Sequence, residues 1–375
     1  MTARGHVIVA WCAIAAALGV VGTGAAADEP EPRALLAQLG FSHQEIERIY
    51  AREIVARTND ADGSAIALAV ATIMEVPAAF YLEKFRAIES FKTSPEVKQI
   101  GRFSATPSES EIASLVLEDE DVDDLRSCRP GSCGLKLDAD GIARLARKDA
   151  RLDTASAAMR AYLAEYAARY LTTGNAALME YRSASKPRRV LDELQTIMVH
   201  SRFLQQSWPA LFDAVANYAG TLPGNLEGFI YWSKEKVGPR AVISLTHVVI
   251  SPVQNGRAAI ATKGIYASHY GDASLGLTLL LELGTPTAPR TLVVYVNRSR
   301  LDIMGGLFGA IKRPLIRSRA RDGAARTMKA LRDRTERQWR EEPQSRVSFI
   351  GMSPQQRRTQ NFELRRVGCC ISQED

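Results

Sequence analysis

The sequence predicts an α+β protein in which an antiparallel sheet wraps around one long C-terminal helix, with an inserted block of helices. Five strand-like segments follow one another between residues 228 and 300, and the turns between them are short enough to make successive strands antiparallel neighbours. An amphipathic pattern over Phe308–Trp339 predicts the long helix. Residues 138–222 repeat their apolar side chains at helical spacing and predict the inserted block.

The first 27 residues have the three parts of a cleavable secretory signal peptide. Arg4 supplies the positive charge, residues 7–21 are uncharged and apolar, and Ala25-Ala26-Ala27 forms the cleavage site. The apolar stretch is shorter than the roughly 20 residues that span a bilayer, although an uncleaved anchor is the alternative. We therefore expect an exported protein, periplasmic or secreted, whose mature chain begins near Asp28.

The segment that follows predicts a helix, a strand, a second helix and a second strand. Ser42 and Glu45 form a capping box at the start of a short helix. Residues 64–76 alternate as a strand does, and Pro77 ends that strand. Pro77 also opens a helix whose apolar stripe is Phe80, Phe85, Ile88 and Phe91. Another strand is expected over 97–103.

Four cysteines remain after the expected cleavage. Cys128 and Cys133 enclose a four-residue turn, and a local disulfide is expected for this pair in an oxidising compartment. Their spacing fits neither a zinc knuckle nor haem attachment. Cys369 and Cys370 are adjacent in a polar tail, where they would bridge to each other only with strain.

The middle of the chain changes from acidic to helical. Residues 118–124 are acidic but lack the glycine and glutamate spacing of an EF-hand loop, so a solvated turn is expected. Beyond them, apolar side chains and tyrosines recur at helical spacing over 157–180, and Pro187 and Pro209 each open a further run. Three or four helices are expected, with their tyrosines in the core.

The final third predicts the sheet and the closing helix. The strands are expected over 228–236, 241–250, 258–270, 274–283 and 291–300. Turn sequences such as Gly238-Pro239 and Asn255-Gly256 separate them. The long helix begins after Gly305-Gly306, and Pro314 is tolerated because it falls in the first turns.

The composition is that of a globular protein, with 46% hydrophobic and 24% charged residues. The net charge of +6 is mild, and no segment resembles a nucleic-acid-binding module, so no nucleic-acid partner is expected. The expected organisation is a signal peptide (1–27), the N-terminal part of an α+β domain (28–137), a helical insertion (138–222), the meander with the long helix (223–342) and a polar tail (343–375).

This order of elements resembles the START-like, or helix-grip, superfamily. Residues 65–91, a strand that runs through Pro77 into a helix, are similar to its opening. Residues 291–339, a last strand that enters the closing helix, are similar to its end. The resemblance covers about half of the chain and implies a START-like antiparallel sheet that grips the C-terminal helix, with the helical block inserted.

Several short runs also resemble an uncharacterised family of exported bacterial proteins. They are Leu125–Cys128 with Cys133 and Lys136-Leu137, Tyr231–Glu235, Ser244–His247, Ile265–Tyr270 and Tyr295–Asp302. This resemblance spans nearly the whole mature chain. It implies no activity and transfers no catalytic residue.

The meander carries more polar and aromatic side chains than a core sheet needs. We therefore expect a ligand to contact Tyr231, His247, Tyr266, Ser268, Tyr270 and Asn297. Strict alternation places Tyr266, Ser268 and Tyr270 on one face of their strand. Lys263 and His269 then lie on the other face. One side of each strand would then line a cavity.

Three other interpretations of this region stay open. A nucleophilic site would combine Ser268 or Ser233 with His247 or His269 and with Asp272 or Asp302, although the chain lacks a Gly-x-Ser-x-Gly elbow. A metal site would use the two histidines with Asp272. In the third interpretation, these polar groups only pin the strand ends by hydrogen bonds.

The predicted long helix is strongly basic, and its charge has two interpretations. It is either the solvated face of an amphipathic helix or a surface for anionic lipid headgroups. The side chains concerned are Lys312, Arg313, Arg317, Arg319, Arg321, Arg326, Lys329, Arg332, Arg334, Arg337 and Arg340.

The preferred hypothesis is an exported START-like protein that binds an apolar or lipid-like molecule between its sheet and its C-terminal helix. It includes no catalytic residue, metal or cofactor. The first alternative is an enzyme that uses the His247/His269 region. The second is a protein-interaction module that uses the helical block.

Overall fold

The computed structural model describes residues 31–59, 65–236, 238–302 and 309–342. The expected signal peptide, most of the turn at 59–63, and the polar tail with Cys369 and Cys370 lie outside these ranges. Among the helices within them, none combines the length and the hydropathy needed to cross a bilayer.

One eight-stranded antiparallel sheet organises the described chain, in the order β1-β2-β10-β9-β8-β7-β6-β3. Its strands are β1 (Val55–Asn59), β2 (Ala65–Met74), β3 (Val97–Arg102), β6 (Glu227–Glu235), β7 (Val242–Gln254), β8 (Arg257–Ala267), β9 (Gly271–Glu282) and β10 (Thr291–Leu301). The predicted five-strand meander, β6 to β10, is confirmed. Strand β10 closes it against β2, which lies far away in the sequence.

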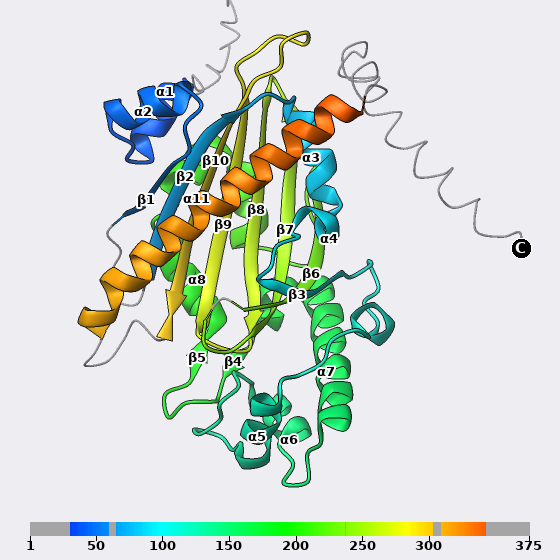
Figure 1. Cartoon of the computed structure of the whole chain (residues 1–375). Helices are drawn as coiled ribbons and strands as arrows, with labels where there is room; N and C mark the ends of the chain where they lie inside the picture. Colours follow the sequence, from blue (N-terminus) through cyan, green and yellow to red (C-terminus); the bar gives the residue numbers. More distant parts are fainter. Residues whose placement is uncertain (1–30, 60–64, 237, 303–308, 343–375) are drawn as a thin grey trace, which may run out of the picture.

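The long C-terminal helix, α11 (Gly309–Glu341), covers one face of this sheet, here called the α11 face. It runs diagonally across the strands towards the first helix after β2 (Figure 1). That helix is α3 (Ala78–Arg86), and the short α4 (Ile88–Phe91) follows it. The rings of Trp339 and Phe80 meet edge to face at 5.0 Å. The predicted α+β class, with a large antiparallel sheet and a long closing helix, is confirmed.

The opposite face of the sheet is covered by the other helices, and it is called the helical face. These helices share one hydrophobic cluster with the sheet. They are α1 (Pro32–Gln38), α2 (His43–Tyr50), α5 (Asp119–Ser127), α6 (Ala139–Leu145), α7 (Leu152–Thr173), α8 (Val190–Met198), α9 (Arg202–Ser207) and α10 (Pro209–Ala216). Two 3₁₀ turns, Glu109–Ile112 and Gly174–Ala177, and a two-stranded sheet, β4 (Glu180–Tyr181) with β5 (Arg188–Arg189), complete the fold.

The acidic run corrects one expectation, because it begins α5 rather than forming a solvated turn. The backbone N–H of Glu118 donates to the Asp121 side chain at 3.3 Å, which satisfies a group at the helix start. Carboxylates in the first turn also complement the positive end of the helix dipole. Asp121 is only 1% exposed, so its charge is used inside the protein.

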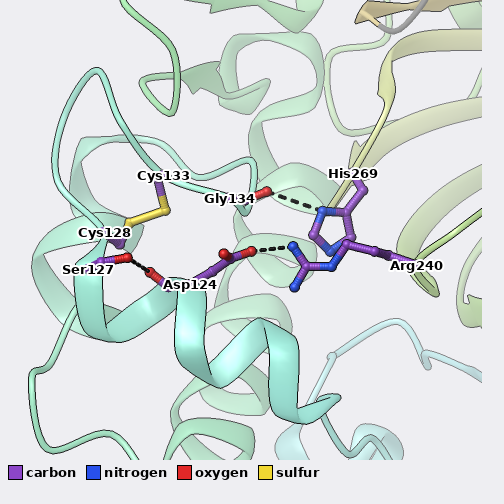
Figure 2. Close-up of a disulfide and its surroundings, with 7 residues drawn as sticks. All are labelled: Asp124, Ser127, Cys128, Cys133, Gly134, Arg240 and His269. Carbon is purple, nitrogen blue, oxygen red and sulfur yellow. Dashed lines mark hydrogen bonds and ion pairs between the residues drawn. A yellow bond between two sulfur atoms is a disulfide. The ribbon is translucent and has the colours of Figure 1, made fainter.

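A disulfide joins Cys128 to Cys133 just after α5 (Figure 2). Within the enclosed turn, Gly131 has a φ of +83°, a conformation that glycine adopts without strain. The turn fixes the position of Gly134, whose carbonyl accepts a hydrogen bond from the His269 ring at 3.2 Å. The loop is therefore fastened to the end of β8.

Candidate functional site

The α11 face of the sheet changes from apolar to polar along the strands. In the rows nearest α3, large apolar side chains from five strands are buried together, namely Val70, Met74, Ile250, Ile260, Leu280 and Val293. Met328 and Trp339 of α11 and Phe80 of α3 belong to the same cluster. These rows are an ordinary interface between helix and sheet, and they hold α11 in place by burying apolar surface.

Further along the same face, small and polar residues occupy parts of two adjacent rows, from β8 to β10 in the first row and from β6 to β10 in the second. In one row Asn297, Gly276 and Thr262 are neighbours. In the next row Ser299, Ser274, Gly264, Thr246 and Tyr231 are neighbours. We call these eight residues the hydroxyl band. Most of the band is half-buried, whereas the apolar rows beside it are buried.

The band contains hydroxyl groups that make no hydrogen bond to a residue the structure describes. Among the described residues, the hydroxyls of Thr246, Thr262 and Ser274 have no hydrogen-bond partner. The glycines of the band leave room for them, because a Cβ on Gly276 would lie only 2.4 Å from the Thr262 hydroxyl. Glycine within a strand often marks a close approach by a ligand or another backbone. The band can therefore donate to and accept from a bound molecule.

Two tyrosines, Tyr231 and Tyr295, lie on the α11 face in or beside the band. Burial raises the pKa of the Tyr295 phenol to about 12, and Tyr231 adds to the effect. Tyr231 lies on β6 and Tyr295 on β10, with three strands between them. Asn297 accepts a hydrogen bond from Ser299 at 2.7 Å and is the only amide of the band.

A charged pair closes the β6 end of the band. Lys92, just after α4, forms an ion pair with Glu235. Ser233 donates to the same carboxylate at 2.6 Å and lies 3.1 Å from the hydroxyl of Ser244. The charges of this pair neutralise each other, so the band beside it is polar but carries no net charge.

The structure separates the six residues that the sequence grouped as ligand contacts. Tyr231 and Asn297 belong to the hydroxyl band. His247 and Tyr266 point into the cluster on the helical face. Ser268 is fully buried after β8 and accepts from the backbone N–H of Ile243 at 2.9 Å. Tyr270 lies in the β8–β9 turn, where its hydroxyl accepts from the backbone N–H of Arg240 at 3.1 Å.

A β-bulge explains why the predicted alternation at Tyr266 is wrong. Thr246 pairs with Gly264, but Leu245 pairs with Tyr266, so Ile265 is an extra residue in β8. Such an insertion shifts every later side chain to the other face. Ile265 and Tyr266 consequently both enter the cluster on the helical face, the side on which Lys263 is also buried.

His247 and Lys263 form a buried basic pair on the helical face. Lys263 donates to the Asn175 side chain at 2.6 Å and to the Val215 carbonyl at 3.0 Å. The His247 ring lies 3.1 Å from the Tyr170 hydroxyl. Burial lowers the pKa of Lys263 to about 7, and burial together with Lys263 lowers the pKa of His247 well below its usual value. These contacts tie the sheet to the helices.

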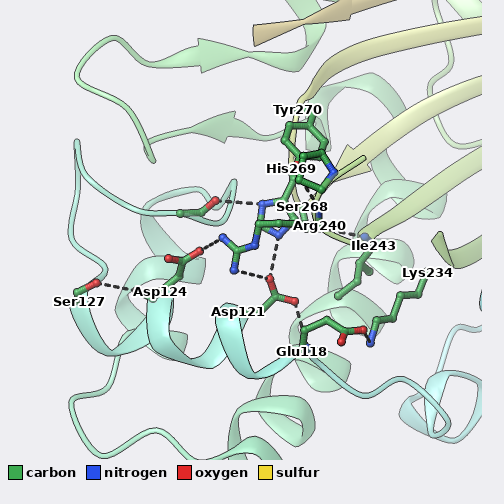
Figure 3. A network of polar contacts seen from close by, with 12 residues as sticks. Glu118, Asp121, Asp124, Ser127, Lys234, Arg240, Ile243, Ser268, His269 and Tyr270 are labelled. Carbon is green, nitrogen blue, oxygen red and sulfur yellow. Dashed lines mark hydrogen bonds and ion pairs between the residues drawn. The ribbon is translucent and has the colours of Figure 1, made fainter. Parts of the chain in front are cut away.

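His269 belongs to a different network, at the junction of α5 and the sheet (Figure 3). Its Nε2 atom lies 2.9 Å from an oxygen of Asp121, and the same oxygen accepts from Arg240 at 3.2 Å. Arg240 also pairs with Asp124, and Lys234 pairs with Glu118 at 2.5 Å. The network fastens α5 to the ends of β6 to β8.

This separation removes the geometric basis for the nucleophilic and metal interpretations. His247 and His269 share no polar partner, and the Ser268 hydroxyl bonds backbone rather than a histidine. Asp272 forms an ion pair with Lys136 instead of approaching either histidine. In the described ranges, no three histidine, cysteine or acidic side chains are grouped as metal ligands would be.

Two surface pockets lie away from the hydroxyl band. The larger, of about 630 Å³, opens between α6, the end of α7 and β4. Two of its charged residues, Arg182 and Glu180, pair with each other at 2.5 Å. The smaller, of about 330 Å³, lies beside β3. Neither gathers groups that would do chemistry.

Sequence reasoning missed most of the band because it weighted aromatic and ionisable residues. The pattern that could have revealed the band is a short alternation, Thr262-x-Gly264 in one strand and Ser274-x-Gly276 in the next. Small polar residues at every second position of adjacent strands leave a sheet face without a packed apolar layer.

Comparison of the chain with models of protein families, with curated proteins and with solved structures gives no match.

Proposed function

We propose that the protein is an exported carrier that binds an amphipathic, lipid-like molecule on the α11 face of the sheet. The polar end of the ligand contacts the hydroxyl band. Its apolar part lies against the neighbouring apolar rows and the edge of α11. The observation that supports this most directly is the band itself. There Gly264, Gly276 and hydroxyls that bond to no described residue take the place of large apolar side chains.

The chemistry of the face suits such a molecule. Hydroxyl and amide groups both donate and accept, so they suit uncharged polar groups such as sugar hydroxyls or ester carbonyls. The adjoining apolar rows favour hydrocarbon, at roughly 0.8 kcal/mol for each methylene removed from water. A face that is polar at one end and apolar at the other favours a ligand with the same division.

The order of the elements supports a START-like, helix-grip architecture for this carrier. Strand β2 leads into α3, the meander β6 to β10 returns to β2, and β10 leads to α11 on the same face. Export is part of the proposal and rests on the signal-peptide pattern of residues 1–27. The Cys128–Cys133 disulfide agrees with an oxidising compartment.

Native mass spectrometry of the mature protein, purified from the periplasm and followed by organic extraction, tests the proposal. We expect an amphipathic molecule in a fixed ratio to protein. The double variant Thr262→Leu/Ser274→Leu fills the band with apolar side chains and should lose that molecule. A matched control is Ser251→Leu, on β7 outside the band and also half-buried. It should retain the ligand.

The proposal fails if the parent protein carries no ligand and takes none from a lipid extract. It also fails if the Thr262→Leu/Ser274→Leu protein holds the ligand in the parent's ratio. The same spectrum shows whether the mature chain starts at Asp28, which tests export separately from binding.

A further inference from the structure

The positive charge of the protein is concentrated on one helix. Over Gly309–Glu341, α11 carries eleven lysines and arginines against four aspartates and glutamates, a net charge of +7. The whole chain has a net charge of only +6, so the rest of it is slightly acidic. The net positive charge of the chain therefore resides on α11.

Five of these cations form a line on the outer side of the helix, which we call the basic stripe. They are Arg319, Arg326, Lys329, Arg337 and Arg340, and all five are exposed. At about 100° per residue they fall within an arc of about 80°, and they span about 32 Å along the helix axis. Met328 and Trp339, on the inward side, are each 5% exposed. The stripe therefore faces solvent.

Most of the stripe is not neutralised by the protein. Arg319, Arg337 and Arg340 form no ion pair with any residue that the structure describes. Lys329 pairs with Asp333 at 2.5 Å, and Arg326 interacts electrostatically with Glu96. By contrast, the inward Arg332 of the same helix is used internally, since it donates to the Arg52 carbonyl at 2.6 Å.

An exposed apolar side chain lies on the same side of the helix. Leu315 is 53% exposed, and its helical position falls within the arc of the stripe. A basic stripe with a protruding apolar residue is typical of helices that lie in a membrane interface, where the apolar group inserts between headgroups. A nucleic-acid backbone would gain little from Leu315.

We infer that the basic stripe docks the protein on a membrane surface rich in anionic lipid headgroups, with α11 parallel to that surface and Leu315 inserted. The straight, one-sided line of charge matches a flat anionic surface. This inference goes beyond ligand binding and does not depend on it. Together with the proposed function, it places the hydroxyl band beside the membrane from which a ligand would be taken.

Vesicle flotation with the mature full-length chain tests the inference. We expect binding to vesicles of equal parts phosphatidylcholine and phosphatidylglycerol, but not to phosphatidylcholine alone. Each basic residue near an anionic surface strengthens binding about fivefold, so Arg319→Gln/Arg326→Gln/Arg337→Gln should weaken partitioning about 100-fold. Leu315→Ser should also weaken it, and the loss should persist at high salt, where screening removes the charge contribution.

A matched control keeps the net charge of the triple variant but changes exposed cations outside α11. Arg147→Gln/Lys148→Gln/Lys186→Gln serves this purpose, and it should bind vesicles nearly as the parent does. Equal weakening in both triple variants would overturn the inference, because binding would then follow net charge alone. The inference would also be overturned if the parent bound duplex DNA and the Leu315→Ser substitution left vesicle binding unchanged. Ligand retention, measured on the same proteins, reports separately on the proposed carrier function.

Discussion

Lys263 and His247 are buried side by side between the sheet and the helices, and neither forms an ion pair with a described residue. Both were visible in the sequence as polar residues of the meander. Their strands were predictable, but their burial was not, because it depends on Asn175, Tyr170 and Val215 from the distant helical segment. A polar residue in a strand acquires its role from what packs on it.

The buried lysine should make stability depend on pH. Its pKa is lowered to about 7 by burial, while the ordinary value is 10.5. Between these values the unfolded chain binds a proton that the folded chain does not, so the free energy of unfolding should rise with pH, by at most about 1.4 kcal/mol per unit. Urea titrations at several pH values between about 7 and 9.5 measure this dependence. Lys263→Met should reduce the dependence of the free energy of unfolding on pH. The same slope in this variant and in the parent would contradict the prediction.

His269 should stabilise the fold, because both nitrogens of its ring are hydrogen-bonded. His269→Leu leaves the Asp121 carboxylate and the Gly134 carbonyl without that donor, so we expect a loss of about 2–4 kcal/mol. Gln in place of His269 keeps a donor within reach of Asp121 and should recover part of the loss. Equilibrium unfolding measures both. Equal stability of the Leu variant and the parent would show that the network in Figure 3 contributes little.

At the scale of elements, the meander and the closing helix were predictable because each is coded locally. Alternation and turn residues define β6 to β10, and a long amphipathic pattern defines α11. The hydroxyl band was not predictable in the same way. It exists only when Ser274 of β9 lies beside Gly264 of β8, and the register that joins them is set across the sheet. The bulge at Ile265 is likewise a property of the pair of strands.

The packing of α11 on the sheet should depend on its C-terminal half. Trp339 is 5% exposed and meets the Phe80 ring at 5.0 Å. Trp339→Ala should therefore lower the free energy of unfolding by about 3–5 kcal/mol. The neighbouring, exposed Arg340→Ala should change it by less than about 0.5 kcal/mol. Chemical denaturation of the two variants is the measurement, and similar values for both would mean that α11 is only loosely attached.

At the scale of the whole molecule, the sheet is a central layer with helices on both faces (Figure 1). The sequence indicated that residues 138–222 are helical, but not which face they cover. Antiparallel strands with one solvated face would read as a clean alternation of apolar and polar residues, whereas β9 carries Leu275 to Leu281 with few polar breaks. This nearly continuous apolar run is what a strand buried on both faces requires.

The pairing of β2 with β10 also bears on how the chain reaches this fold. Val70 pairs with Tyr295, a separation of 225 residues, and α11 comes later still. The sheet cannot close until almost the entire polypeptide is present, and such long-range pairing makes folding slow. The sheet of the finished fold is therefore completed only after the last strand has been synthesised.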